Sequence, residues 1–319
     1  MLNPVRASTL RVVRKSQEVK INREKIKEAA RKWVKAGLKV PRWPRQYHLI
    51  TKDKQRMLDY LVVLDSLNFC YWANGPKRWQ IEYNGKKYNG YFGWSLTLKK
   101  FFEENPKKAN LEYFSKISFR DFKKILQGGK NLLFLKKRWQ ILKAVSQTIL
   151  KKYGSSLKFI ESAGRKLSVL TPKIVKELPF FNDVSRYQGK KVYFLKRAQI
   201  LGSEIWGAFS GKGIGYFKDL DYLTCFPDYK IPQALNNFGI LEYSKSLERK
   251  IKNRDTIPVG SSREVEIRAC TVWAVEYLKE ELGRLGRKIS AVEVDWILWN
   301  KTKEMQMKKP YHLTKTIFY

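Results

Sequence analysis

The fold of this chain is decided by residues 196–232, KRAQILGSEIWGAFSGKGIGYFKDLDYLTCFPDYKIP. Apolar residues recur at helical spacing after Lys196, and this pattern predicts a helix with the lysine at its N-terminal end. The glycine-spaced residues 211–215 predict a tight turn after that helix. Pro227 then restricts the backbone before Asp228, and a short amphipathic segment follows. The stretch therefore places a lysine and an aspartate at the borders of predicted elements.

Helical patterns also dominate the sequence on both sides of this stretch. An asparagine cap followed by apolar residues at helical spacing predicts a helix that begins at Asn22. Further helices are predicted over residues 54–67, 96–104, 118–127, 133–153, 156–163, 172–178, 267–282 and 292–305. The persuasive strand signal is Trp79–Tyr91, where Asn84-Gly85 joins two short runs as a type I′ turn would. The predicted fold class is mainly α, with one small β-hairpin near residues 79–91.

Length and composition predict a globular chain. The 319 residues are 43% hydrophobic, which is enough apolar side chain for a sizeable core. We expect residues 1–20 to be a basic arm of unsettled order and residues 21–319 to be a single domain, with a subdivision near 155–170 left open. No apolar run approaches the ~18 residues of a membrane span. The N-terminus lacks the apolar core of a secretory signal, and three scattered cysteines indicate buried thiols in a cytoplasmic protein.

The charge is strongly unbalanced, with 65 Lys and Arg against 29 Asp and Glu and a formal net charge of +36. A field this positive attracts phosphate and polynucleotides by counterion release, whatever the specific function. The alternative for any one basic cluster is a solvated helix face. Non-specific nucleic-acid binding is therefore expected.

Several longer segments resemble segments of one protein family and follow one another in the same order as in that family. Together they extend from about residue 55 to the C-terminus. These segments are LNFCYW (67–72), GYFGWSL (90–96), FNDV (181–184), GKKVYFLKRAQIL (189–201), REVEIRACTVWAVE (263–276) and the ending from Pro310 to Tyr319. They resemble the queuosine salvage family, the queuosine 5′-phosphate N-glycosylase/hydrolases, which release the base queuine from its nucleotide. The opening stretch also has a distant likeness to helix-hairpin-helix DNA glycosylases. The resemblance implies a compact helical fold like those glycosylase domains and a small-molecule nucleotide substrate.

The resemblance assigns catalysis to Asp228 and Lys196. Cleavage of a ribosyl–base bond passes through an oxocarbenium-like state, which needs a carboxylate and a positioned water. Asp228 could stabilise the cationic sugar and orient the water, or it could attack the sugar directly. Lys196 could pair with Asp228 or contact the ribose or base. From the residues alone, Asp228 could equally cap a helix and Lys196 could be a solvated surface lysine.

The resemblance also suggests residues that bind the substrate. Aromatic rings would stack on the base, and nearby polar groups would bind its edge, its diol or the 5′-phosphate. These rings could equally belong to the core, and the charges near residue 264 could form a structural ion network. The candidate binding residues are Asn68, Phe69, Trp72, Trp94, Ser95, Asp183, Arg197, Tyr229, Lys230 and Glu264.

Other reaction classes find little support in the sequence. With only His48 and His312, and no cysteine pair at zinc-ligand spacing, metal catalysis is disfavoured. The chain has neither a phosphate-binding Walker loop nor a Gly-x-Ser-x-Gly elbow, so we expect a cofactor-free hydrolase. Two alternatives stay open, namely a non-enzymatic nucleic-acid-binding protein and a glycosylase that acts on a base flipped out of a polynucleotide. The oligomeric state is not predicted.

Overall fold

The computed structural model describes residues 3–72 and 77–319. Helices dominate the described residues, and the strands form three two-stranded antiparallel pairs. The mainly helical fold class is confirmed. The helices are α1 (Pro4–Val13), α2 (Arg23–Lys35), α3 (Lys54–Ser66), α4 (Gly90–Glu104), α5 (Leu111–Lys116), α6 (Phe119–Ile125), α7 (Leu135–Tyr153), α8 (Ser156–Glu161), α9 (Leu167–Glu177), α10 (Lys196–Ala208), α11 (Lys230–Asn237), α12 (Lys245–Lys252), α13 (Ser262–Arg284) and α14 (Ala291–Glu304). The strands are β1 (Val19–Ile21), β2 (Gln80–Tyr83), β3 (Lys86–Asn89), β4 (Val184–Tyr187), β5 (Lys190–Tyr193) and β6 (Leu241–Tyr243).

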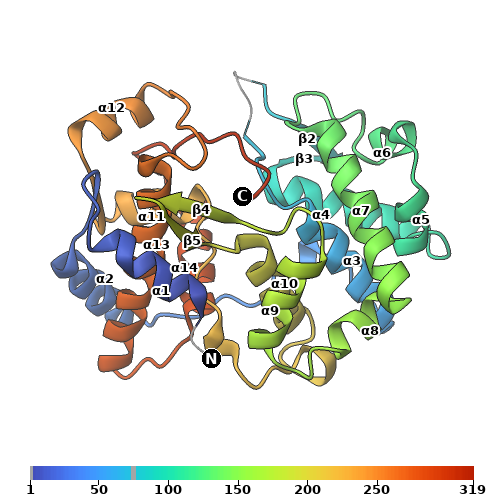
Figure 1. Ribbon diagram of the computed structural model, residues 1–319, viewed down its shortest axis with the longest axis horizontal. Coiled ribbons are helices and arrows are strands. Elements are labelled where there is room, and N and C mark those ends of the chain that lie inside the picture. The colour runs from blue at the N-terminus through green and yellow to red at the C-terminus, as the bar shows by residue number, and fades with distance from the viewer. Residues whose placement is uncertain (1–2, 73–76) are drawn as a thin grey trace.

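Helices from the first and the last part of the sequence pack together on one side of the molecule. Helices α1 and α2 lie against α13, while α3 to α8 form the other side, as Figure 1 shows. Helix α10 lies between the two groups and packs on α3. One contiguous hydrophobic cluster includes buried residues from both sides, from Val5 to Leu313. A subdivision near residues 155–170 stays a prediction.

The N-terminal segment holds helix α1 and is tied to the interior. Val5 and Val12 are buried, and the Arg6 guanidinium donates to the carbonyl oxygens of Tyr222 (3.0 Å) and Leu223 (2.8 Å). Arg6 also pairs with Glu276 of α13 at 2.9 Å. The basic residues at this end of the chain therefore alternate with apolar ones that anchor the helix.

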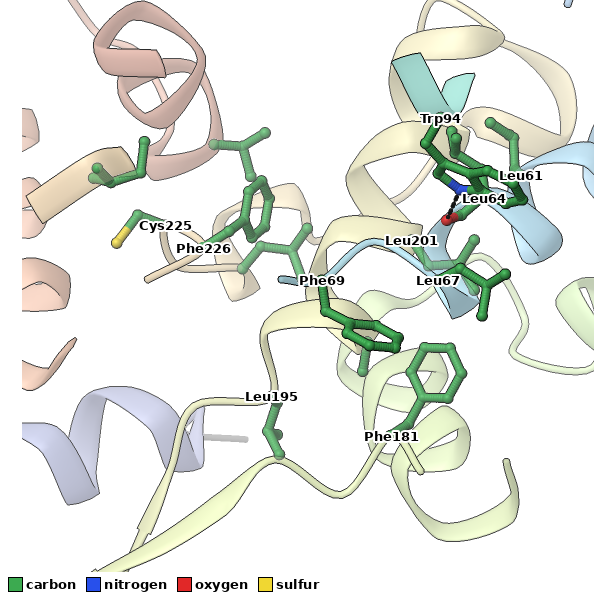
Figure 2. Close-up of a cluster of buried hydrophobic side chains, with 14 of the residues drawn as sticks. Leu61, Leu64, Leu67, Phe69, Trp94, Phe181, Leu195, Leu201, Cys225 and Phe226 are labelled. Carbon is green, nitrogen blue, oxygen red and sulfur yellow. Dashed lines mark hydrogen bonds between the residues drawn. The ribbon is translucent and has the colours of Figure 1, made fainter. Parts of the chain in front are cut away.

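The core between α3, α4 and α10 contains one of the predicted site residues. In Figure 2, Trp94 of α4 lies beside Leu61 and Leu64 of α3, and its indole Nε1 donates to the Leu64 carbonyl at 2.9 Å. Trp94 is 2% exposed. Its ring belongs to the packing of these helices, since its one polar atom is satisfied by the backbone.

Several local predictions differ from the structure. Helix α4 begins at Gly90 rather than at 96, and α13 begins at Ser262 rather than at 267. Helix α9 begins at Leu167 rather than at Pro172, because the carboxylate of Asp219 accepts from the backbone nitrogens of Leu167 (2.7 Å) and Ser168 (2.9 Å) and caps the helix five residues earlier. The predicted hairpin at 79–91 is present as β2 and β3, but the β4–β5 hairpin was missed. Two adjacent lysines at the start of β5 hide the alternation of polar and apolar residues that marks a strand. The turn between β4 and β5 consists of Gln188 and Gly189, both at positive φ.

Candidate active site

A cleft opens between the two groups of helices. Its walls come from residues 41–44, 68–72 and 89–91 of the N-terminal half, and from α10, residues 226–231, α14 and the tyrosines 311 and 319 of the C-terminal half. Seven of the twelve predicted site residues line it. They are Asn68, Phe69, Trp72, Lys196, Asp228, Tyr229 and Lys230.

Asp228 lies at the start of α11 in the middle of this cleft. Its Oδ1 accepts from the backbone nitrogens of Lys230 (2.6 Å) and Ile231 (3.1 Å), so the carboxylate does cap a helix. Among the described residues no donor contacts its Oδ2. The cap fixes the orientation of the side chain and leaves one carboxylate oxygen available in the cleft.

Lys196 is buried at the first position of α10. Its Nζ donates to the carbonyl oxygen of Asn68 at 2.9 Å, which links the two walls of the cleft. Burial lowers the pKa of Lys196, while the charges of Asp228 and Asp65 act in the opposite direction. The ammonium group therefore lies within electrostatic reach of Asp228, as the predicted pair requires.

A second carboxyl group, from Asp295 of α14, lines the same cleft and was missed by the sequence analysis. Its Oδ2 accepts from the backbone nitrogen of Phe226 at 2.8 Å. Burial raises the pKa of Asp295 well above its usual range, and the neighbouring charge of Asp228 adds to this effect. Two acidic groups in one cleft thus have different environments. Its position inside the apolar run of α14 gave no local signal of a site.

The cleft continues to a pocket lined by aromatic rings and one glutamate. Glu204 of α10 accepts hydrogen bonds from the Trp43 indole and from the Tyr91 hydroxyl, the latter at 2.8 Å. Burial raises the pKa of Glu204. Trp296 and Trp299 of α14 also line this end. None of these residues was predicted, because each lies in sequence that is equally typical of a core.

Three predicted binding residues lie outside the cleft lining as core or backbone-bonded groups. Trp94 packs in the core described above. The Ser95 hydroxyl donates to the Phe92 carbonyl at 3.2 Å, and the Arg197 guanidinium donates to the carbonyls of Ser66 and Phe180. Their polar atoms are used by the local backbone.

Asp183 and Glu264 belong to a buried ion network around Arg268 of α13. The two carboxylate oxygens of Asp183 accept from Arg268 at 2.6 and 2.9 Å, and Glu264 lies 3.4 Å from the same guanidinium. These contacts form the structural ion network that was the alternative to substrate binding for the charges near residue 264. Asp183 still affects the cleft, because its Oδ2 accepts from the backbone nitrogen of Lys196 at 3.1 Å and holds the start of α10.

Two other features are absent from the described part of the chain. No group of three or more His, Cys, Asp and Glu side chains is placed to hold a metal ion within residues 3–72 and 77–319. In the same residues, every helix is too short or too polar to cross a membrane.

Known proteins place the chain in a family. A family model described as queuosine salvage protein matches residues 47–319. A protein of Sphaerobacter thermophilus named queuosine 5′-phosphate N-glycosylase/hydrolase is 37% identical, over 99% of this chain and 97% of its own length. Proteins with the same name from Dictyostelium discoideum (33% identical, 100% of both chains) and Mus musculus (30%, 98% of both) also match. With one family model across most of the chain and relatives aligned over nearly their whole lengths, this chain belongs to the queuosine salvage protein family.

Proposed function

We propose that this protein hydrolyses the N-glycosidic bond of queuosine 5′-phosphate and releases queuine and ribose 5-phosphate. The observation that carries the proposal is the position of Asp228, which has a carboxylate oxygen available in the cleft and lies within electrostatic reach of the buried Lys196. The names of the relatives supply the substrate.

In the proposed reaction the bond between C1′ of the ribose and the base nitrogen breaks, and its electron pair goes to the base. The developing cation on the sugar is stabilised by Asp228, which either orients the attacking water or forms a short-lived ester with C1′. Water supplies the hydroxyl group on C1′ and a proton balances the charge on the departing base.

Asp295 is placed to supply that proton. Burial raises its pKa well above the usual range, and it lies near Asp228 in the same cleft. A carboxyl group that stays protonated can donate to a leaving group, while a second one carries negative charge. We therefore assign Asp295 as the acid and Asp228 as the stabilising base or nucleophile.

The planar base would occupy the pocket lined by Trp43, Tyr91 and Trp296, where rings offer stacking surfaces. Glu204 can accept hydrogen bonds from the donor edge of a guanine-type base. The cysteines of the described chain are free and buried, which supports the cytoplasm as the location of the reaction.

The test measures the release of free queuine from queuosine 5′-monophosphate by chromatography with mass detection. The wild type should release queuine, and Asp228→Asn should be slower by about a hundredfold or more, since one oriented electrostatic group is typically worth ~3 to 4 kcal/mol of barrier. Asp221→Asn, an exposed aspartate outside the cleft, is the matched control and should keep wild-type activity. No release by the wild type would refute the substrate assignment.

A further inference from the structure

His48 contacts two residues of the aromatic pocket around Glu204 but does not itself line that pocket. Its imidazole ring is buried and stacks on the indole of Trp43, with the ring centres 4.3 Å apart. Burial lowers the pKa of His48 to about 3, and the charge of Lys99 acts in the same direction. The ring is therefore neutral at physiological pH, so that one of its nitrogens carries a hydrogen and the other accepts one.

Both side chains that donate hydrogen bonds to Glu204 are in contact with His48. The Tyr91 hydroxyl donates to Oε1 of Glu204 at 2.8 Å, and the Trp43 indole donates to Oε2 of the same group. The Tyr91 oxygen lies 3.4 Å from Nε2 of His48, and Trp43 is the indole that stacks on the imidazole. One neutral ring thus contacts the two donors that fix both oxygens of a carboxyl group in the pocket.

The number of hydrogens in this chain of contacts assigns the tautomer of His48. Tyr91 has one hydroxyl hydrogen and gives it to Glu204, so the Tyr91 oxygen can only accept from His48. Nε2 must then carry the ring hydrogen, and Nδ1 accepts from the Tyr60 hydroxyl, which lies 3.1 Å away. The Tyr60 hydroxyl is also 3.2 Å from the Ser95 carbonyl oxygen. The opposite tautomer would draw the hydrogen of Tyr91 to His48 and away from Glu204.

Helix α10 restricts the position of Trp43 as well. Gly207 lies three residues after Glu204 on this helix. A Cβ atom at residue 207 would come within 2.8 Å of Cδ1 of Trp43 and within 2.8 Å of Cη2 of Trp296. The two indoles can therefore approach the backbone of α10 only because residue 207 has no side chain. Trp43 is thus in close contact with α10 as well as with His48.

We propose that His48 is a positioning residue for Glu204. It donates from Nε2 to Tyr91 and stacks on Trp43, and so holds both donors of the carboxyl group in the orientation that the substrate base requires. The proposal rests on the function proposed above, because it takes the pocket around Glu204 as the place of the base. A binding group is held accurately when its own hydrogen-bond partners are fixed in turn. Without the Nε2 donor, the Tyr91 hydroxyl is free to turn away from Glu204.

The tautomer can be measured directly, because the chain has only two histidines, His48 and His312. Two-dimensional NMR of protein labelled with ¹⁵N-histidine, assigned with His312→Gln, should show His48 neutral and protonated on Nε2 at neutral pH. This spectrum is independent of any catalytic activity. A wild-type His48 that is protonated on Nδ1 instead would overturn the proposal.

The same spectrum tests the contact with Tyr91. In Tyr91→Phe the share of the Nε2-protonated tautomer should fall, because Nε2 loses its acceptor while Tyr60 can still accept from Nδ1. The matched control is Tyr47→Phe, since Tyr47 precedes His48 but stacks on Phe92. It should leave the tautomer unchanged. An unchanged tautomer in Tyr91→Phe would contradict the assigned hydrogen bond.

Two substitutions of His48 separate donation by Nε2 from packing. His48→Phe keeps a ring for Trp43 but cannot donate to Tyr91, whereas His48→Gln places an amide nitrogen near the position of Nε2. Titration calorimetry with queuine should show at least about tenfold weaker binding to His48→Phe, as expected for the loss of one hydrogen bond, and at least about threefold recovery in His48→Gln. Tyr47→Phe should bind as the wild type does. Equal losses in two folded His48 variants, or no loss in His48→Phe, would overturn the positioning role.

These outcomes are distinct from those that test the reaction. If the wild type binds queuine but releases none from the nucleotide, the proposed reaction fails, and an affinity that depends on the Nε2 donor still supports the role of His48. If the wild type hydrolyses the nucleotide but queuine binding is the same in all variants, the reaction stands and the positioning role is rejected.

Discussion

Lys196 illustrates how one buried side chain can set the chemistry of another. Its ammonium is removed from solvent, donates to the Asn68 carbonyl at 2.9 Å, and experiences the charges of Asp228 and Asp65. Burial of this ammonium lowers the pKa of Lys196, and the charge of Asp228 opposes that change. The pair therefore puts a buried positive charge within electrostatic reach of the carboxylate that caps α11.

Replacement of this lysine should lower the rate of catalysis. In Lys196→Gln, a buried positive charge that acts on Asp228 is lost, so kcat should fall by about tenfold or more. The measurement is queuine release with saturating substrate. Lys212→Gln serves as the comparison, since Lys212 is exposed and does not line the cleft. An equal kcat in the two variants would contradict the electrostatic role.

Some of the residues predicted for the site line the cleft. Asp228 and Lys196 do lie together in the cleft, and so do Asn68, Phe69 and Trp72. Asp295 could not be found in this way, because an acid inside an apolar helix has no local signal that separates a site residue from a helix position. Its role depends on which residues face it.

At the level of elements, helix α13 connects the two segments that carry the predicted catalytic pair. Arg268 donates to the carboxylate of Asp183, and that carboxylate also accepts from the backbone nitrogen of Lys196. The Nε of Arg268 donates to the carbonyl oxygen of Pro227, the residue before Asp228, at 2.9 Å. One guanidinium thus holds the start of α10 and the segment before α11. Arg268 is a positioning residue.

Arg268→Lys should separate this positioning from simple stability. Lysine keeps the charge but cannot contact Asp183 with two donors and the Pro227 carbonyl at the same time. We expect kcat to fall by between about tenfold and a hundredfold with a smaller change in KM, because small misplacements of reacting groups are costly. Arg263→Lys is the matched control, since Arg263 begins the same helix at the surface and pairs with Glu18. Equal kinetics of the two variants would refute the positioning role.

Elements were predicted best where a local signal marks their ends. The Asn22 side chain accepts from the backbone nitrogen of Lys25 at 3.0 Å and starts α2, as its sequence indicated. The start of α9 was wrong, because its cap comes from Asp219, 52 residues downstream of Leu167. The pairing of β1 with β6 was not predicted for the same reason, since Val19 pairs with Tyr243, which lies 224 residues further along the chain. A cap or partner from a distant segment leaves no local trace.

For the whole molecule, the formal charge of +36 exceeds what a nucleotide cleft requires. The unbalanced positive charges are spread over the whole chain. A positive field of this size attracts polyanions without reading their sequence.

The protein should therefore bind unstructured RNA in a way unrelated to its chemistry. If six to ten phosphates are contacted, affinity should fall by about 10³ to 10⁵ between 50 and 200 mM salt. Fluorescence anisotropy with a labelled oligonucleotide measures this, and Asp228→Asn should bind as the wild type does. Release of a base from the RNA would instead favour the polynucleotide glycosylase. Weak binding without salt dependence would contradict the expectation that the net positive charge attracts polyanions.

The sequence by itself determined the helical class, most helix positions, the hairpin near 79–91 and the lysine and aspartate of the cleft, because periodicity, caps and a family's ordered motifs are written in consecutive residues. Only the tertiary structure decided that Trp94 belongs to the core, that Asp183 and Glu264 serve Arg268, and that Asp295, Glu204 and Lys303 line the cleft. The walls of that cleft come from segments more than 200 residues apart. Whether a charged or aromatic side chain packs, pairs or faces a ligand depends on the neighbours that folding brings to it, and those neighbours are distant in the chain.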